Sequence, residues 1–409
     1  MTAHVLEARK APGVVFFCIN FLALLYVVPF SSLMLFFGVS AVLVKGKELV
    51  DAREQGAYLG LAILVLLLLL SFYHSGSVVI GTKSPVGWYL EKAAPSLLES
   101  LRAFNGLSGI GVSYCFLRTV YALLQPKLDL WGFVRYYFFL PTFFSGPILR
   151  TDEYLSQTPA YMRSNVAPAL ARVTLGAIKV LASQLIQGFL PLASEPAMIE
   201  KIQTPSFLGV WGFAFSAGIW LYLNFSGFSD MCIGFAKLFN VTVPENFNNP
   251  FAARDITDFW RRWHMTLATW LRTCIYTPVA RGLGNRLGQQ HLALHILPPL
   301  VTMAVCGLWH GVSLGYIIWG GMHGAGLVIH QGWKLAVAPK LSPGFRATPA
   351  YNALAWLITH AYISLAWVFF FPSPTPSLRL SLLYLTRMFG LVSYEIDMAI
   401  TNFAAHVPL

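Results

Sequence analysis

Residues 254–286 read RDITDFWRRWHMTLATWLRTCIYTPVARGLGNR and combine six arginines with two acids in a chain that is otherwise largely apolar. The arginines at 261, 262 and 272 mostly point away from an apolar stripe. At helical spacing, that stripe is formed by Trp260, His264, Leu267 and Leu271. We therefore expect a helix whose only histidine faces the element against which it packs. A buried imidazole needs a hydrogen-bond partner or a chemical role, so His264 is a candidate functional residue.

The composition indicates an integral membrane protein. The chain is 56% hydrophobic and 11% charged, whereas a soluble domain carries about 25% charged residues. The run LGLAILVLLLLL lies within residues 55–71, and about 20 apolar residues span a bilayer as a helix. The net charge of +11 could suggest nucleic acid, but excess Lys and Arg in such a chain mark cytoplasmic loops and anionic headgroups. We therefore expect membrane lipids as partners and no nucleic acid.

The apolar segments predict an all-α polytopic fold with roughly nine to eleven transmembrane helices, plus re-entrant or interfacial helices. We expect a single integral membrane domain over residues 1–409, because no internal repeat or linker divides the chain. The first segment and the 205–240 segment are long enough to bend or to hold two passes. The segments lie near 13–44, 57–80, 106–125, 131–149, 166–193, 205–240, 291–312, 313–335, 350–371 and 377–400.

The charges of the polar loops predict the orientation. Residues 272–291 and 334–349 carry Lys and Arg without an acid, so we expect both to face the cytoplasm. Two apolar passes lie between them, which is the even number that this orientation requires. Residues 193–204 hold two glutamates and one lysine and could face outside. The five cysteines are scattered without a CxxC pair, so they indicate neither a disulfide framework nor a metal site.

A second informative stretch is CGLWHGVSLGYIIWGGMHG, residues 306–324, which places two histidines among glycines. Glycines allow helices or a re-entrant turn to pack closely. Ionisable residues at membrane depth are costly and are functional hypotheses by default. The alternative is that each histidine ties helices together by a hydrogen bond. His310, between Trp309 and Gly311, is the stronger functional candidate, and His323 is a possible secondary one.

Further polar side chains lie in the apolar run LYLNFSGFSDMCIG, residues 221–234. Asn224 and Asp230 are candidate binding residues, although contact between helices or the capping of a loop is the more ordinary role for each. A carboxylate in a membrane needs a cationic partner, and an arginine of residues 254–286 could supply it for Asp230.

Four stretches of the chain resemble the motifs of the membrane-bound O-acyltransferase family. They most resemble its bacterial branch, which acetylates alginate or transfers D-alanine to teichoic acids. The resemblance covers a core of about 140–335 in order and spacing. The motifs are PTFFSGPILR (141–150), FSGFSDMCIGFAKLFNVTVPENFNNPF (225–251), RDITDFWRRWHMTLATWLR (254–272) and GLWHGVSLGYIIWGGMHG (307–324).

The resemblance implies a multi-helix fold with a central tunnel or funnel and two catalytic positions. The family's invariant histidine falls on His310, in GLWHG, and its second position falls on His264, in RRWH. The branch usually has Arg-Asp where this chain has Arg272-Thr273, and Gly-Gly where it has Ala280-Arg281. Where Leu314 stands, the branch often has Trp. These departures concern substrate details more than the chemistry.

These residue types suit acyl transfer. An acyl thioester is already activated, so the enzyme must align a hydroxyl with the carbonyl and remove its proton. A neutral histidine does this well, and a positioned base contributes typically 10²–10⁴-fold. We assign His310 as the general base and His264 as a residue that orients His310 or the donor, or polarises the carbonyl. Trp309 joins the binding candidates. A donor phosphate or phosphopantetheine could be held by Arg261, Arg262 and Arg272. The alternative is that these arginines anchor the protein to lipid headgroups.

The sequence therefore predicts a multi-pass enzyme of the bacterial inner membrane that transfers an acyl group, first of all acetyl, to hydroxyls of an extracytoplasmic polysaccharide. No tightly bound cofactor is expected, and the donor is a thioester substrate, acetyl-CoA or a phosphopantetheine carrier. Expected partners are a donor or carrier protein on the cytoplasmic side, an acyltransferase partner outside, and the glycan acceptor. D-alanyl transfer to a teichoic-acid-like polymer is the alternative. A transporter or flippase is the other class, but no repeated halves support it.

Overall fold

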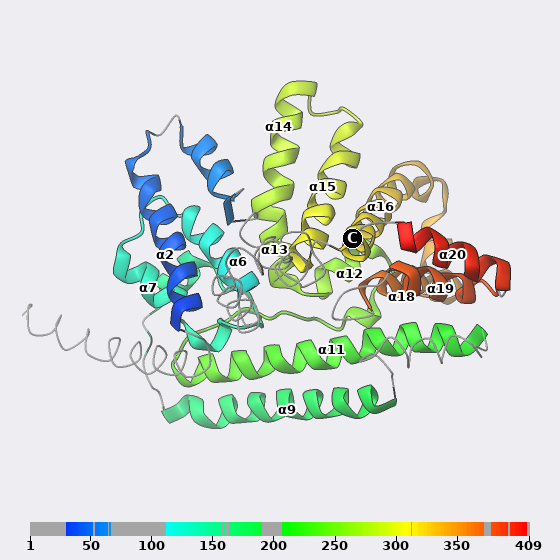
Figure 1. The fold of residues 1–409 in the computed structure, drawn as a ribbon, viewed down its shortest axis with the longest axis horizontal. Coiled ribbons are helices and arrows are strands. Elements are labelled where there is room, and N and C mark those ends of the chain that lie inside the picture. Colours follow the sequence, from blue (N-terminus) through cyan, green and yellow to red (C-terminus); the bar gives the residue numbers. More distant parts are fainter. Residues whose placement is uncertain are drawn as a thin grey trace, which may run out of the picture. The chain divides into compact units, whose positions relative to one another are not determined.

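The structure is a computed structural model (Figure 1), and the chain divides into two compact units, Met1–Gly176 with Phe228–Glu245 and Ala177–Gly227 with Asn246–Leu409. The prediction of one membrane domain stays a prediction. Within the described residues the structure is helical, without a β-strand. It describes residues 30–51, 54–63, 65–66, 112–157, 159, 163–189, 207–311, 313–371, 378–391 and 393–406.

Aromatic side chains hold the first unit together. The ring of Phe37 on α2 stacks on Phe133 and meets Tyr137 edge-on, with centroids 5.7 and 5.5 Å apart. Offset and edge-to-face pairs of this kind add to the free energy of apolar burial. The elements of this unit are α2 (Phe30–Gly46), α6 (Val112–Leu123), α7 (Leu130–Tyr137) and α8 (Thr151–Leu155), with short 3₁₀ turns η1 (Lys47–Leu49), η2 (Leu140–Thr142) and η3 (Arg163–Asn165).

The predicted span 131–149 is wrong, because α7 ends at Tyr137 after eight residues. About 20 residues are needed to cross a bilayer. The guanidinium of Arg118, which is 2% exposed, donates to the carbonyls of Tyr136, Tyr137 and Phe139 at 3.0, 2.9 and 3.3 Å. These bonds satisfy carbonyls at the end of the helix, so the chain can leave helical geometry before the prolines and glycine of 141–147.

Two long helices, α9 (Val166–Phe189) and α11 (Phe207–Leu238), run side by side in Figure 1 and contribute residues to both units. The described part of the 205–240 segment therefore forms one helix over 207–238, and the two-pass alternative is wrong. No proline interrupts residues 207–238, so the strongest helix breaker is missing from this stretch. Gly234 permits the close approach of α9, since a Cβ there would lie 2.8 Å from the carbonyl oxygen of Ala169.

The helical hairpin of α15 and α16 is the most extensive helix pair of the second unit. Cβ atoms added at Gly307 or Gly320 would overlap the backbone of the facing helix, so only glycine permits this packing. The elements are η4 (Pro250–Ala252), α12 (Ile256–Arg262), α13 (Met265–Leu271), the π-helical turn η5 (Arg272–Tyr276), α14 (Thr277–Leu287), α15 (Ala293–His310), α16 (Leu314–Ala336), η6 (Ala338–Lys340), α17 (Pro343–Ala347), α18 (Pro349–Phe370), α19 (Leu378–Met388) and α20 (Tyr394–His406).

Several segment predictions can be compared with these elements. The helices predicted near 291–312, 313–335 and 350–371 are confirmed as α15, α16 and α18. Residues 272–291 are mostly helical rather than a loop. Residues 377–400 form parts of two helices rather than one, because the chain turns at Gly390, whose φ is +70°.

Three of the described helical stretches are long and apolar enough to cross a membrane, namely Val166–Gly188, Ala293–His310 and Pro349–Phe370. Parts of the predicted segments 13–44, 57–80, 106–125 and 166–193 lie outside the described residues, as does the whole loop 193–204. The count of nine to eleven spans, the orientation and the central tunnel therefore stay predictions.

Candidate active site

The predicted single helix through His264 is broken into two. Helix α12 ends at Arg262, Trp263 is extended, and His264 has left-handed backbone angles of φ 44° and ψ 52°. An upstream segment supplies the hydrogen bonds that the helix loses. The N–H of Asn248 donates to the carbonyl of Arg262 at 2.9 Å, and the N–H of Met265 donates to the carbonyl of Asn246 at 2.9 Å.

The predicted burial of this stripe is confirmed, since Trp260, His264, Leu267 and Leu271 are all buried. The left-handed conformation costs a residue with a side chain roughly 1–2 kcal/mol. Conformations of this kind persist where the surroundings over-determine them, and they cluster at functional sites. The backbone of His264 therefore adds an independent reason to regard it as a functional residue.

The side chain of His264 has one polar partner and one unsatisfied nitrogen. Its Nδ1 lies 3.0 Å from Oδ1 of Asn246, and its ring meets that of Phe225 edge-on at 4.6 Å between centroids. Its Nε2 is buried without a hydrogen-bond partner among the described residues. Burial lowers the pKa of His264 well below its usual value, and positive charge on His310 lowers it further. His264 is therefore held as a neutral imidazole.

His310 is the last residue of α15 and is surrounded by aromatic rings. The centroid of its imidazole lies 4.6 Å from that of Trp309, 5.2 Å from that of Trp319 and 4.9 Å from that of Phe370. Trp309 also contacts His264, at 6.4 Å between centroids. The two predicted catalytic histidines thus lie in one unit, on either side of Trp309, and each is within electrostatic reach of the other. His310 is half-buried, whereas His264 is buried.

His323 lies on α16 and is fully buried. Its Nδ1 accepts a hydrogen bond from the indole N–H of Trp260 at 3.3 Å, and its ring meets Trp319 at 4.8 Å between centroids. It therefore ties α12 to α16, as the ordinary interpretation of an intramembrane histidine expects. Because Trp319 also contacts His310, His323 supports one wall around that side chain.

The three arginines proposed for donor binding differ in whether they already form ion pairs or hydrogen bonds within the protein. Arg262 pairs with Asp258 one turn earlier at 2.9 Å and donates to the carbonyl of Asn248 at 3.3 Å, so its contacts are structural. Arg261 and Arg272 are exposed. Arg272 begins the π-helical turn η5, and such turns are frequent at functional sites.

Asp230 has a cationic partner, but the prediction that an arginine of 254–286 supplies it is wrong. The partner is Arg172 of α9, whose Nε donates to Asp230 at 2.8 Å. The same guanidinium reaches Glu245 at 2.5 Å. The close approach of α9 at Gly234 brings this arginine to Asp230, in the first unit, whereas the two histidines belong to the second. Asn224 donates to Ser183 of α9 at 3.3 Å, which is a contact between helices.

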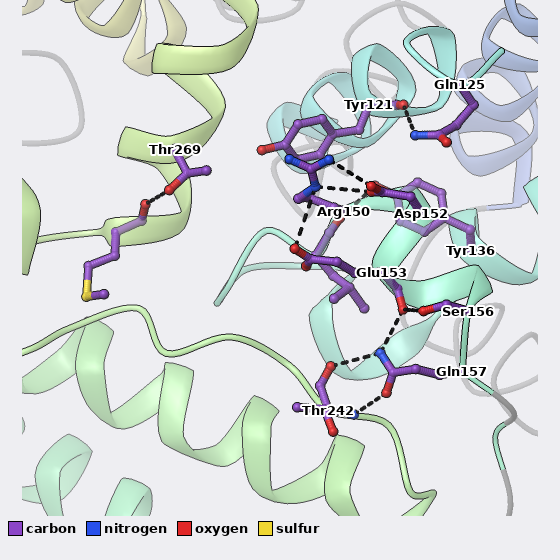
Figure 2. Close-up of polar contacts among 12 residues, drawn as sticks. Tyr121, Gln125, Tyr136, Arg150, Asp152, Glu153, Ser156, Gln157, Thr242 and Thr269 are labelled. Atoms are coloured by element: carbon purple, nitrogen blue, oxygen red, sulfur yellow. Dashed lines mark hydrogen bonds and ion pairs between the residues drawn. The ribbon is translucent and has the colours of Figure 1, made fainter.

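The motif PTFFSGPILR contacts Cys232 of α11, within the first unit. Gly146 has a φ of +102°, and a Cβ there would lie 2.8 Å from Sγ of Cys232. At the end of the motif, Arg150 pairs with Asp152 at 2.7 Å and lies 3.6 Å from Glu153 (Figure 2). This hydrogen bonding lowers the pKa of Asp152 below its usual value. The charge of Arg150 is therefore locally neutralised, and the motif has a clear structural role.

One residue that the sequence interpretation missed is Asn246, the partner of His264. Asn246 lies 18 residues upstream, in PENFNNPF, where nothing in the periodicity of the 254–286 segment indicates it. Polar residues in an extended stretch of 241–249, directly before a proline, were the only available signal.

Comparisons with known proteins identify the family of the chain. The family model described as MBOAT, the membrane-bound O-acyltransferase family, matches residues 13–371. The chain is 34% identical over 238 residues to the peptidoglycan O-acetyltransferase of Helicobacter pylori, covering 57% of this chain and 42% of that protein. It is 30% identical over 287 residues to a probable alginate O-acetylase of Pseudomonas fluorescens, covering 67% and 53%.

A third relative is the teichoic acid D-alanyltransferase of Streptococcus thermophilus, 27% identical over 291 residues, covering 64% of this chain and 68% of that protein. The chain belongs to the membrane-bound O-acyltransferase family. It spans about half the length of the O-acetylating relatives that it matches.

Proposed function

We propose that the chain is a multi-pass enzyme of the bacterial inner membrane that transfers an acetyl group from a thioester to hydroxyls of an extracytoplasmic envelope polysaccharide. The observation that carries this proposal is the pairing of His264 and His310 around Trp309, at the family's two motif positions. The names of the relatives from Helicobacter and Pseudomonas support acetyl as the acyl group and a polysaccharide as the acceptor.

The chemistry requires one base and no covalent intermediate. The acceptor hydroxyl oxygen attacks the thioester carbonyl carbon while His310 takes the hydroxyl proton. The carbon–sulfur bond then breaks, and the departing thiolate takes the proton back from His310, so that ester and thiol are the products. His310 suits this role because it is half-buried and able to meet an acceptor, and a positioned base contributes typically 10²–10⁴-fold.

His264 suits a supporting role beside His310. It is buried and neutral, so it adds no positive charge that would oppose protonation of His310 when that residue takes the hydroxyl proton. It can accept a hydrogen bond from the reacting hydroxyl or from His310, which would align the base. Holding the reacting groups in this way contributes through proximity and orientation.

The donor is proposed to be a substrate, acetyl-CoA or a phosphopantetheine carrier protein, approaching from the cytoplasm. The exposed arginines Arg261 and Arg272 remain available for its phosphate groups. A separate extracytoplasmic acyltransferase partner and the glycan complete the proposed system.

D-alanyl transfer is the second candidate, because the Streptococcus D-alanyltransferase is matched over the larger share of its own length. The test is deletion of the gene in its native host, followed by measurement of ester-linked acetate and ester-linked D-alanine in the envelope. We expect acetate to fall and to return with the parent gene or with His291→Ala, an exposed histidine, but not with His310→Ala. Loss of D-alanine alone would support the second candidate. Unchanged levels of both esters would overturn the proposal of acyl transfer.

A further inference from the structure

Asn246 makes an arrangement of hydrogen bonds that fixes the orientation of its own side chain. It is 1% exposed, and its Oδ1 accepts from the hydroxyl of Thr266 at 2.9 Å and from the backbone N–H of Thr266 at 3.4 Å. A backbone N–H can only donate, so the atom that it reaches must be the amide oxygen. The same oxygen lies 3.0 Å from Nδ1 of His264.

This orientation determines the tautomer of His264. An amide oxygen is an acceptor only, so Nδ1 must carry the proton. In a neutral imidazole the other nitrogen then holds the lone pair. The buried Nε2, which has no hydrogen-bond partner among the described residues, is therefore the basic nitrogen of His264.

The backbone of the same residue also places the histidine. The carbonyl of Asn246 accepts from the N–H of Met265 at 2.9 Å, directly after the left-handed His264. One residue thus holds both the backbone and the ring of His264. An ordinary buried asparagine could fill the backbone role alone, so the experiment must distinguish the two.

The surroundings explain why the residue is an amide rather than a carboxylate. The ring of Phe225 on α11 and that of Trp309 on α15 pack against His264, and neither can titrate. Among the described residues, the titratable group whose charge acts on His264 is His310 on α15. A carboxylate at position 246 would add a negative charge beside Nδ1 and favour the imidazolium form.

We infer that Asn246 is a positioning residue for acyl transfer: its side-chain oxygen holds Nδ1–H of His264, so that the lone pair of Nε2 is presented beside His310. This inference rests on the proposed function, since it assigns a role within that reaction. Partners that orient a functional histidine in metal sites typically contribute 10–100-fold, and we expect a loss of that order when Asn246 is replaced by Leu.

The discriminating variant is Asn246→Asp, which preserves size while adding charge. Asn248→Asp is the matched control, because it adds the same charge two residues along, on an exposed side chain. Isolated membranes from the expressing host are supplied with radiolabelled acetyl-CoA, and label entering the envelope polysaccharide is measured against pH. In Asn246→Asp, His264 should become protonated at low pH, so transfer should fall there and recover as pH rises through the raised pKa. The parent and Asn248→Asp should lack this added acid limb.

A second readout does not depend on activity. Nitrogen NMR of the purified parent, labelled with ¹⁵N-histidine and assigned by comparison with His264→Gln, should show His264 with a protonated Nδ1 and an unprotonated Nε2. A protonated Nε2 in the parent, or an identical pH profile for Asn246→Asp and Asn248→Asp, would overturn the inference. If the parent transfers no acetyl, the proposed function fails instead, and the tautomer still decides the role of Asn246.

Discussion

Replacing Arg172 should destabilise the protein more than replacing its partner Asp230. The carboxylate of Asp230 is 6% exposed, and Arg172 lies 2.7 Å from it. Loss of the arginine leaves a buried charge without this partner, which costs about 3–5 kcal/mol for buried pairs. Loss of the carboxylate through Asp230→Asn leaves Arg172 paired with the more exposed Glu245 at 2.5 Å. We expect that variant to lose about half as much free energy, roughly 1.5–3 kcal/mol, the size of one hydrogen bond to a charged group.

The assay is thermal unfolding of detergent-purified protein, followed by fluorescence-detected gel filtration. The expected order of midpoints is parent, then Glu245→Gln, then Asp230→Asn, with Arg172→Gln lowest. The exposed Glu245 carboxylate should contribute no more than about 1 kcal/mol, as surface pairs do. Equal midpoints for Arg172→Gln and Glu245→Gln would refute the assignment of Arg172 as the buried carboxylate's counter-ion.

Three further predictions address the second unit. Gly307→Ala should cost about 1–3 kcal/mol of stability, because its Cβ would overlap the facing backbone, whereas Gly321→Ala, which meets nothing within 4 Å, should be neutral or stabilising in the same unfolding assay. His323→Ala should lower envelope acetate less than loss of His310, because His323 acts through Trp319; an equal loss would give it a direct role. The pKa of His264 lies well below 6.5 in the folded protein, so below pH 6.5 the unfolded chain binds a proton at this residue and the folded chain does not. The free energy of unfolding should therefore be unaffected by His264 above pH 6.5 and fall as pH drops below it. His264→Phe should remove that part of the acid slope, and an unchanged slope would contradict the burial of a neutral imidazole.

The local sequence pattern predicted several helices and the burial of His264. It did not predict where the helix breaks or which residue forms a hydrogen bond with His264. The apolar period correctly indicated that His264 is buried, and the glycines of 306–324 correctly indicated a close helix pair. Periodicity carries no information about a segment that supplies hydrogen bonds from 18 residues upstream, so the break at His264 and the role of Asn246 could not be seen.

The same limit explains the other corrections. Residues 131–149 are apolar enough for a span. However, helix α7 ends where the guanidinium of Arg118, on α6, donates hydrogen bonds to the last carbonyls of α7. The sequence favours the arginine-rich segment as the source of a partner for Asp230, because most of the neighbouring arginines lie there. Its actual partner is a single arginine, Arg172, brought there by the packing of α9 at Gly234.

The most direct test of the central claim is transfer by His310→Ala per folded molecule. The variant leaves a small apolar residue that a membrane helix tolerates, so it should insert, purify and melt like the parent. Ester-linked acetate in the deletion host, divided by the folded protein measured by gel filtration, should fall at least about 10²-fold, the low end for loss of a general base. A folded His310→Ala protein that retains most of the parent's acetate would contradict the account.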